Sequence, residues 1–209
     1  IWENAGLPVV PYITIRKTDR EDATTFEAII KKSERDFEWP VFIKPCKAGS
    51  SVGANKASNK EEFIKAVDDA LLWDDKILVE AFINAREIEC SVTGFRQISA
   101  YTPGEIVPTH EFYDYEAKYL DPEGAALKIP ADLDEEKIRE VRDIAIKAFK
   151  ALDGCGCSRI DFFLDKDNGK FYLNEINSMP GFTNISMFPK LCESSGLPYP
   201  DLLEKIMYL

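Results

Sequence analysis

The chain has 209 residues, which is enough for one large domain or two small ones with a buried core. Its 37 acidic and 26 basic residues give a net charge of −11, which argues against nucleic acid or an anionic membrane as a partner. No apolar run approaches membrane-spanning length, and five cysteines with one histidine make a poor zinc signature, so we expect reduced thiols in a cytoplasmic protein.

Three helices are predicted from capping boxes, in which a Ser, Thr or Asp is followed three residues later by Glu. These boxes begin at Thr24, Ser58 and Asp132, and the last helix is expected to end at Gly154 in a left-handed cap. Apolar runs predict strands at residues 41–44, 77–80, 87–93, 97–101, 158–164 and 171–176. Short connections favour antiparallel pairing and an α+β fold, which we divide into subdomains of residues 1–83 and 84–209.

The first candidate site follows the strand that ends in Lys44. There Ser50 and Ser51 stand between Gly49 and Gly53. Glycines let the backbone approach a phosphate closely, while hydroxyl and amide groups supply hydrogen-bond donors. No Gly-Lys-Ser/Thr follows, so the turn is not a Walker A loop, and an ordinary glycine-rich turn that binds nothing stays open.

The second candidate is the apolar strand that ends in Glu80. A buried acid beside free backbone groups could hold the amine edge of adenine, and Glu87, a little further along the chain, could accept from ribose hydroxyls. The alternative is an acid at an ordinary sheet edge.

Residues 102–130 are rich in proline and aromatic residues and have no assigned element. A loop of that length in a compact domain is usually a lid or a binding loop. Lys118 within it could bring a positive charge onto a phosphate when the lid closes. The alternative is an insertion packed by its own aromatic side chains.

The last two strands are predicted to form a hairpin closed by Asp167, Asn168 and Gly169. A three-residue loop with a left-handed glycine centres the hairpin on Asn168. That centre places Asp161 opposite Glu175 and Arg159 opposite Asn177, and side-chain alternation puts all four on one face. The same alternation puts three apolar side chains on that face, which a fully solvated face should not carry: Phe163, Phe171 and Leu173.

The four polar residues of this face suit a metal and a phosphate. Two facing carboxylates without a partner would repel each other. With the amide oxygen of Asn177, Asp161 and Glu175 supply the hard oxygen ligands that Mg²⁺ prefers, and Arg159 could neutralise a phosphate or an oxyanion. The alternative is a hairpin with an exposed charged face.

Taken in order, these segments resemble the ATP-grasp fold and, closely, the D-alanine–D-alanine ligases of bacterial wall synthesis. The resemblance covers nearly the whole chain. Its most specific runs are Tyr113-Asp-Tyr-Glu-Ala-Lys-Tyr119 and Pro180-Gly-Phe-Thr183.

The resemblance implies ATP-dependent ligation of two D-alanines through an acylphosphate, in the synthesis of peptidoglycan precursors. ATP would be held at its phosphates by Lys44, Lys118, Ser50 and Ser51, at adenine by Glu80, Ala81, Ile83 and Phe112, and at ribose by Glu87. Two Mg²⁺ ions, for which Mn²⁺ could substitute, would be held by Asp161, Glu175 and Asn177.

For the ligation step, the resemblance implies that Arg159 and the N–H of Gly181 stabilise the oxyanion. Ser186 would bind the carboxylate of the second D-alanine, and Tyr119 would close over it. Tyr119 and Met187 favour D-alanine over D-lactate or D-serine as the second substrate. Those two products, or that of another ATP-grasp carboxylate–amine ligase, remain alternatives.

The chain departs from the family at its beginning, because family members carry an N-terminal domain that binds the first D-alanine. We therefore expect the isolated chain to bind nucleotide weakly and to be inactive as a ligase. Its expected partners are small molecules, ATP and D-alanine, and a homodimer of the full-length protein is left open. A nucleotide-binding module that has lost turnover should lack some of the polar site residues, whereas Arg159, Asp161, Glu175, Asn177 and Lys118 are all present.

Overall fold

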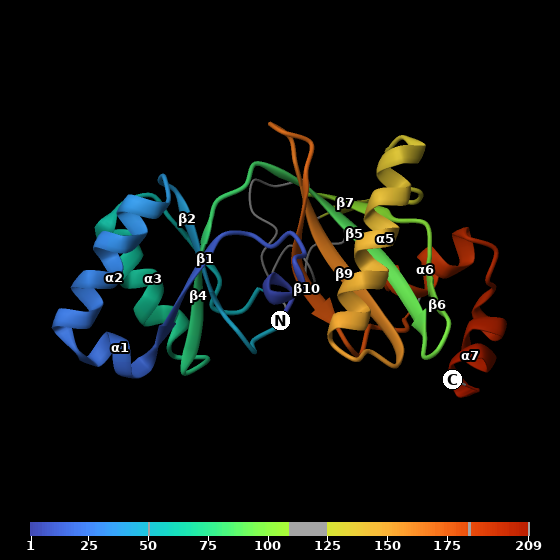
Figure 1. The fold of residues 1–209 in the computed structure, drawn as a ribbon, viewed down its shortest axis with the longest axis horizontal. Coiled ribbons are helices and arrows are strands. Elements are labelled where there is room, and N and C mark those ends of the chain that lie inside the picture. Colours follow the sequence, from blue (N-terminus) through green and yellow to red (C-terminus); the bar gives the residue numbers. More distant parts are fainter. Residues whose placement is uncertain (50, 109–124, 184, 209) are drawn as a thin grey trace. The chain divides into compact units, whose positions relative to one another are not determined.

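The structure is a computed structural model that describes residues 1–49, 51–108, 125–183 and 185–208. These residues form two units, one from residues 10–83 and the other from residues 1–9, 84–108 and 125–208. Within the described ranges, no helix is long and apolar enough to cross a membrane. Figure 1 labels the helices and strands of both units.

The unit of residues 10–83 contains an antiparallel four-stranded sheet in the order β1-β4-β2-β3. Its strands are β1 (Tyr12–Arg16), β2 (Val41–Pro45), β3 (Asn55–Ala57) and β4 (Lys76–Ala81). Its helices are α1 (Lys17–Glu21), α2 (Ala23–Asp36) and α3 (Lys60–Ala70). The predicted strands at 41–44 and 77–80 are thus present, whereas β1 and β3 were not predicted.

One face of this sheet packs against α2 and α3 (Figure 1). Ile43 and Val79 lie on that face and are fully buried against a core that includes Phe63 of α3. Because side chains alternate along a strand, their neighbours Lys44 and Glu80 lie on the opposite face. The sheet therefore separates a hydrophobic face from a face that carries charged groups.

Helices α2 and α3 begin near the predicted capping boxes but use other cap residues, whereas α1 was not predicted. The cap of α2 is Asp22, whose side chain accepts from the N–H groups of Thr24 and Thr25. The cap of α3 is Asn59, which accepts from the N–H of Glu62. In each case a neighbouring residue with an equally suitable side chain reaches the first turn, so the pattern located the helix but not its first residue.

The second unit contains strands in the order β10-β9-β5-β7-β8, with β6 paired to β5, and all of these pairs are antiparallel. The strands are β5 (Ala85–Gly94), β6 (Ile98–Ala100), β7 (Gly104–Pro108), β8 (Ala125–Lys128), β9 (Gly156–Asp165) and β10 (Phe171–Asn177). The helices are α5 (Glu135–Ala151), α6 (Met187–Ser194), α7 (Tyr199–Met207) and the short 3-10 helix η1 (Glu3–Ala5). The predicted α+β class is confirmed.

Helices α5 and α6 lie on opposite faces of this sheet (Figure 1). Ile88 and Cys90 of β5 are fully buried in a core that includes Phe149 of α5. Ser91, the next residue of β5, faces the other way, and its hydroxyl donates to the carbonyl oxygen of Phe188 in α6 at 3.0 Å. The central strand β5 is therefore covered by helices on both faces.

Residues 1–9, which the sequence-based division placed in the first subdomain, pack in the second unit. The indole N–H of Trp2 donates to the carbonyl oxygen of Ala148 at 2.9 Å, and the N–H of Leu173 donates to the carbonyl oxygen of Pro8 at 2.9 Å. These two contacts attach the start of the chain to α5 and to β10.

Helix α5 begins and ends differently from the prediction. Its cap is Asp134, two residues after the predicted Asp132. After its end, the left-handed residue is Asp153, with φ 51°, and not Gly154. A Cβ on Gly154 would lie 2.5 Å from the ring of Phe149, so this glycine is needed for a close contact and not for a left-handed turn.

Candidate functional site

Strands β9 and β10 bring together the four polar residues that the sequence placed on one face. Asp161 pairs with Glu175 and Arg159 pairs with Asn177 in the register of the hairpin. The predicted pairing of these residues is confirmed.

The reason for this register differs from the predicted one. Near the turn, Phe171 pairs with Leu164, and the N–H of Asp165 donates to the carbonyl oxygen of Lys170 at 3.0 Å, which closes a loop of residues 166–169. Gly169 has the expected left-handed φ of 68°, but the loop is one residue longer than predicted. A register shift at Asn174, between Leu173 and Glu175, then moves the pairing by one residue and restores the predicted pairs.

The same register shift overturns part of the prediction about the apolar side chains. Phe171 and Leu173 lie before the shift and are buried in the α5 core, where the ring of Phe171 lies 6.0 Å from that of Phe162. Only Phe163 stays on the face of Asp161, and it is half-buried. The prediction for Phe171 and Leu173 was wrong because a bulge reverses the alternation of β10.

The neighbouring strand β5 adds a carboxylate to this face, which the sequence reasoning had given no role. Glu89 pairs with Asp161 in the register of β5 and β9, and its side chain is buried, with 4% of the residue exposed. Its position two residues after Glu87 on a strand was a signal that both share one face. The pairing of β5 with β9, however, is a tertiary contact that local patterns do not contain.

The polar contacts on this face centre on Arg159. Its Nε and Nη2 donate to the two carboxylate oxygens of Asp161, each at 2.8 Å, and Nε also lies 3.1 Å from Oε2 of Glu89. Asn177 donates through Nδ2 to Oδ2 of Asp161 at 3.0 Å. One guanidinium group therefore bridges acids on two neighbouring strands.

The charges around Arg159 set its protonation. Removal from water opposes its positive charge, but the field of Asp161, the hydrogen bond to Asp161 and the fields of Glu89 and Glu175 outweigh it and raise the pKa of Arg159. The guanidinium group is therefore always charged and is held in a fixed orientation by its two-point contact with Asp161.

The donor set of this face fits a magnesium ion. Asp161 and Glu175 supply carboxylates, and Asn177, which donates through Nδ2, keeps its carbonyl oxygen as a third hard donor. Within the described part of the chain, no three His, Cys, Asp or Glu side chains already form a ligand cluster. The contacts explain this, because both oxygens of Asp161 bind Arg159 and the third donor is an amide. Binding of a cation would therefore shift Asp161 away from one of its bonds to Arg159.

Gly181 and Ser186 lie together just before α6. A Cβ on Gly181 would lie 2.7 Å from Oγ of Ser186, so any larger residue here would have to displace that hydroxyl. The same Oγ accepts from the N–H of Thr183 at 3.0 Å and lies 2.8 Å from the hydroxyl of Thr183. Met187, the next residue, is buried, and its thioether lies near Gly104 of β7.

In the other unit, Lys44 and Glu80 form an ion pair. Lys44 Nζ lies 2.9 Å from Oε2 of Glu80, and the side chains are 20% and 8% exposed. The two residues are diagonal neighbours on β2 and β4, because Phe42 pairs with Glu80 and Lys44 with Leu78. A cation and an acid are thus held side by side at the start of the glycine-rich turn.

The described residues of that turn adopt unusual backbone angles. Ser51 has φ 60° and Gly53 has φ 72°, and the N–H of Ala54 donates to the carbonyl oxygen of Ser51 at 3.1 Å. A serine in the left-handed region is uncommon, and such residues concentrate at ligand-binding sites.

The remaining predicted residues are placed as follows. Ala81 is the last residue of β4, and its N–H donates to the carbonyl oxygen of Pro11 at 3.0 Å, so only its carbonyl group could serve a ligand. Ile83 is half-buried and follows β4, whereas Glu87 is half-buried on β5 of the second unit. Four predicted residues lie outside the described ranges: Ser50, Phe112, Lys118 and Tyr119.

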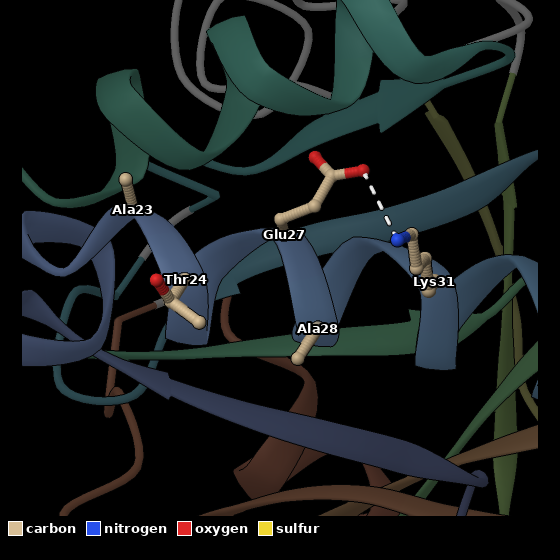
Figure 2. A pocket seen from close by; sticks show the side chains of 5 residues that line it. All are labelled: Ala23, Thr24, Glu27, Ala28 and Lys31. Atoms are coloured by element: carbon tan, nitrogen blue, oxygen red, sulfur yellow. Dashed lines mark ion pairs between the residues drawn. The ribbon is translucent and has the colours of Figure 1, made fainter.

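A separate pocket lies against the outer side of α2, and Figure 2 shows the five side chains that line it. Glu27 and Lys31 form an ion pair of 4.0 Å across one helical turn there, and Lys60 also contacts Glu27, at 3.2 Å. The lining residues are Ala23, Thr24, Glu27, Ala28 and Lys31. None of them is a predicted site residue, so this pocket is not the candidate site.

The chain is similar to one family of proteins, the D-alanine–D-alanine ligases. The family model described as "D-ala D-ala ligase C-terminus" matches residues 1–208. The D-alanine--D-alanine ligase of Treponema denticola is 58% identical over 209 residues, which are 100% of this chain and 57% of that protein. The corresponding ligase of Acetivibrio thermocellus is 50% identical over 100% of this chain and 55% of its own length. The chain thus spans slightly more than half the length of these curated relatives.

Solved structures agree with this assignment. The D-alanine-D-alanine ligase from Coxiella burnetii superposes with a TM-score of 0.84 and 37% identity, over 100% of this chain and 53% of that one. The VanG D-Ala:D-Ser ligase from Enterococcus faecalis superposes with a TM-score of 0.86 and 32% identity, over 99% of this chain and 58% of that one. The fold of the chain is therefore that of the ATP-grasp ligases.

Proposed function

Since this chain belongs to the D-ala D-ala ligase C-terminus family, we propose that the protein that contains it joins two D-alanines at the expense of ATP. The observation that carries the proposal is the polar face of β9 and β10, where Asp161 pairs with Glu175 and Arg159 with Asn177. The names of the relatives, which are 46–58% identical, support the same reaction.

In the first step, a carboxylate oxygen of the first D-alanine attacks the γ-phosphorus of ATP, and the bond to ADP breaks. The product is an acylphosphate. Lys44 and the turn around Ser51 would hold the transferred phosphate, and Glu80, released from Lys44, would accept from the amine of adenine. Glu87 would accept from the ribose hydroxyls. Magnesium held by Asp161, Glu175 and Asn177 would neutralise negative charge on the phosphates.

In the second step, the amine of the second D-alanine attacks the acyl carbon. The carbonyl oxygen then carries a negative charge, which the guanidinium of Arg159 and the N–H of Gly181 would stabilise. The amine loses a proton to solvent, phosphate leaves with the electron pair of the broken C–O bond, and a peptide bond forms. Ser186 would orient the acceptor by donating to its carboxylate.

The number and kind of ions also belong to the proposal. We propose two Mg²⁺ ions, with Mn²⁺ as a substitute, because the carboxylates of Asp161, Glu89 and Glu175 surround the single positive charge of Arg159 and exceed it. Phe112, Lys118, Ser50 and Tyr119 would complete the binding of ATP and acceptor.

A second candidate function is D-alanine–D-serine ligation, which the similarity to the VanG ligase favours. Met187 favours D-alanine as the second substrate, because its buried thioether near Gly104 offers no charged group to the hydroxyl of D-serine. D-Lactate as acceptor, or another carboxylate–amine ligation, follows as a further alternative.

We propose that the reaction serves peptidoglycan precursor synthesis in the cytoplasm, with ATP and D-alanine as small-molecule partners. The full-length protein could form a homodimer. The isolated chain should bind nucleotide weakly and should not turn over, because the relatives carry almost as much sequence again.

The test is phosphate release from Mg–ATP by the full-length protein, with D-alanine alone and with D-serine or D-lactate added to D-alanine. Stimulation by D-alanine alone, with the dipeptide found by mass spectrometry, is the expected result. A mixed product would favour the second candidate. Nucleotide binding without any response to D-alanine would refute both.

A further inference from the structure

The glycine-rich loop, whose described residues are 46–49 and 51–54, is attached near both ends to the turn between α3 and β4. Two consecutive residues of that turn, Trp73 and Asp74, make these contacts. Both lie in the unit of residues 10–83, and neither was singled out by its sequence pattern.

Asp74 holds the start of the loop. Its carboxylate accepts from the N–H of Lys47 at 2.9 Å and from the N–H of Lys76 at 3.2 Å, and Lys47 Nζ lies 3.7 Å from the same group. The side chain is only 3% exposed. Removal from water opposes its ionisation, but the N–H of Lys76, the charge of Lys47 and the N–H of Lys47 outweigh this and hold the pKa of Asp74 below its ordinary value.

Trp73 holds the end of the loop. A Cβ on Gly53 would lie 2.5 Å from Cδ1 of Trp73 and 3.0 Å from Cγ of Pro45, so the backbone of Gly53 rests directly on the indole edge. Trp73 is 61% exposed, which is unusual for so large an apolar side chain, and this contact gives it a role that core packing does not. The left-handed φ of 72° at Gly53 is a second reason for glycine at this position.

We propose that Trp73 and Asp74 are positioning residues that hold the glycine-rich loop in the conformation that receives the phosphates of ATP. The role of the loop rests on the proposed function, whereas the clamp itself does not. A loop of small residues loses conformational freedom when it binds a ligand, and contacts that order it beforehand reduce this loss. The clamp therefore acts on the affinity for ATP and not on the chemical step.

The direct test measures hydrogen exchange of single amides in the chain without ligand. In Asp74→Asn the side chain keeps one acceptor oxygen for two backbone donors, so the amide of Lys47 or Lys76 should exchange roughly 10- to 100-fold faster. In Trp73→Ala the amide of Ala54, which donates within the loop, should exchange about 2- to 10-fold faster.

Matched controls exist in the same turn. Leu72→Ala removes a side chain that is 81% exposed, and Asp75→Asn changes an acid whose side chain is 85% exposed. Neither should alter exchange in the loop. Unchanged exchange in Asp74→Asn and Trp73→Ala, or equal changes in the controls, would overturn the clamp.

The second test uses the full-length protein. Both variants should raise the KM for ATP by roughly tenfold, with kcat within about twofold, because they weaken binding without touching the reacting groups. Faster loop exchange with an unchanged KM would overturn the positioning role. Failure of the proposed function would look different, because the parent protein would then show no D-alanine-dependent turnover while the exchange results still decide the clamp.

Discussion

Arg159 and Asp161 are joined by two parallel hydrogen bonds of 2.8 Å, although they lie only two residues apart on the same strand. Residues at i and i+2 of a strand share a face, and the forked guanidinium spans the distance between them. Nε of Arg159 also reaches Glu89 on β5, at 3.1 Å. The orientation of this one cation is therefore set by acids on two strands.

Replacing Arg159 by lysine should lower kcat by about 10²- to 10³-fold, because an ammonium group keeps the charge but not the fork that faces a developing oxyanion. Nucleotide affinity should change little. Steady-state kinetics and nucleotide titration of the full-length protein check this. Arg142→Lys is the control, because Arg142 contacts only the carbonyl oxygen of Ala100 among the contacts described. A kcat near that of the parent would rule out the role of Arg159.

Glu89→Gln should lower kcat by about tenfold and leave the KM for ATP unchanged, because it removes one of the two acids that orient Arg159. The kcat of Glu89→Asp should lie between that of Glu89→Gln and that of the parent. Glu105→Gln provides a matched comparison, since Glu105 is 5% exposed and binds Arg86 through two hydrogen bonds of 2.8 and 2.7 Å. That change should lower the unfolding free energy but not kcat. Equal losses of kcat in Glu89→Gln and Glu105→Gln would speak against a specific role of Glu89.

Gly181→Ala should raise the KM for the second D-alanine, because the added methyl group would meet Oγ of Ser186 at 2.7 Å and displace it. Ser186→Ala removes the same hydroxyl directly. If Gly181 acts through Ser186, the double variant should be no worse than the more impaired single variant. Acceptor titrations of the three variants measure this, and strictly additive losses would contradict it.

Buried thiols give a prediction that is independent of activity. Burial raises the pKa of Cys90 and of Cys192 to about 12, whereas Cys155 is exposed. Only about one in 10⁴ of the buried thiols is a thiolate at pH 8, so an alkylating reagent should label Cys155 and spare Cys90 and Cys192 until the protein unfolds. Peptide mapping by mass spectrometry with and without denaturant checks this. Labelling of Cys90 as fast as Cys155 in the folded chain would refute it.

The same two thiols should make the protein less stable in alkali. Unfolded cysteines lose their protons near pH 8.5, while the folded ones keep them up to about pH 12, so above about pH 8.5 the unfolded state binds fewer protons. The contribution of these groups to the unfolding free energy is therefore complete below that pH and falls as the pH rises towards 12.

The hairpin shows how far sequence reasoning reached and where it stopped. Side-chain alternation and the turn signal at Gly169 predicted four polar residues on one face, and the observed register agrees: Arg159, Asp161, Glu175 and Asn177. Two errors cancelled, however, because the loop is one residue longer than expected and the shift at Asn174 compensates for it. A bulge leaves no local signature comparable to a glycine turn, so it could not be predicted.

Contacts between segments far apart in sequence were the second feature that the sequence could not predict. Glu89 was visible as an acid on a predicted strand, but only the pairing of β5 with β9 places it beside Asp161. The clamp at Trp73 and Asp74 likewise depends on contacts between segments far apart in sequence, since Asp74 lies 27 residues after Lys47. The positions of α2, α3 and α5 were found because capping residues cluster, whereas the cap itself depends on which side chain reaches the first turn. Helices α1, α6 and α7 were not predicted, because none of their caps is a Ser, Thr or Asp followed three residues later by Glu.

The register shift at Asn174 divides β10 into two segments, and alternate side chains of the two segments point to opposite faces of the sheet. Before it, Phe171 and Leu173 belong to the core; after it, Glu175 and Asn177 belong to the polar face. Substitutions of Phe171 or Leu173 should therefore change the unfolding free energy, whereas substitutions of Glu175 or Asn177 should change activity. Deletion of Asn174 would leave both sets of pairs intact, because Leu173 and Glu175 already pair with the consecutive residues Phe162 and Asp161. An insertion or deletion of one residue elsewhere in β10 would instead turn part of the strand to the opposite face.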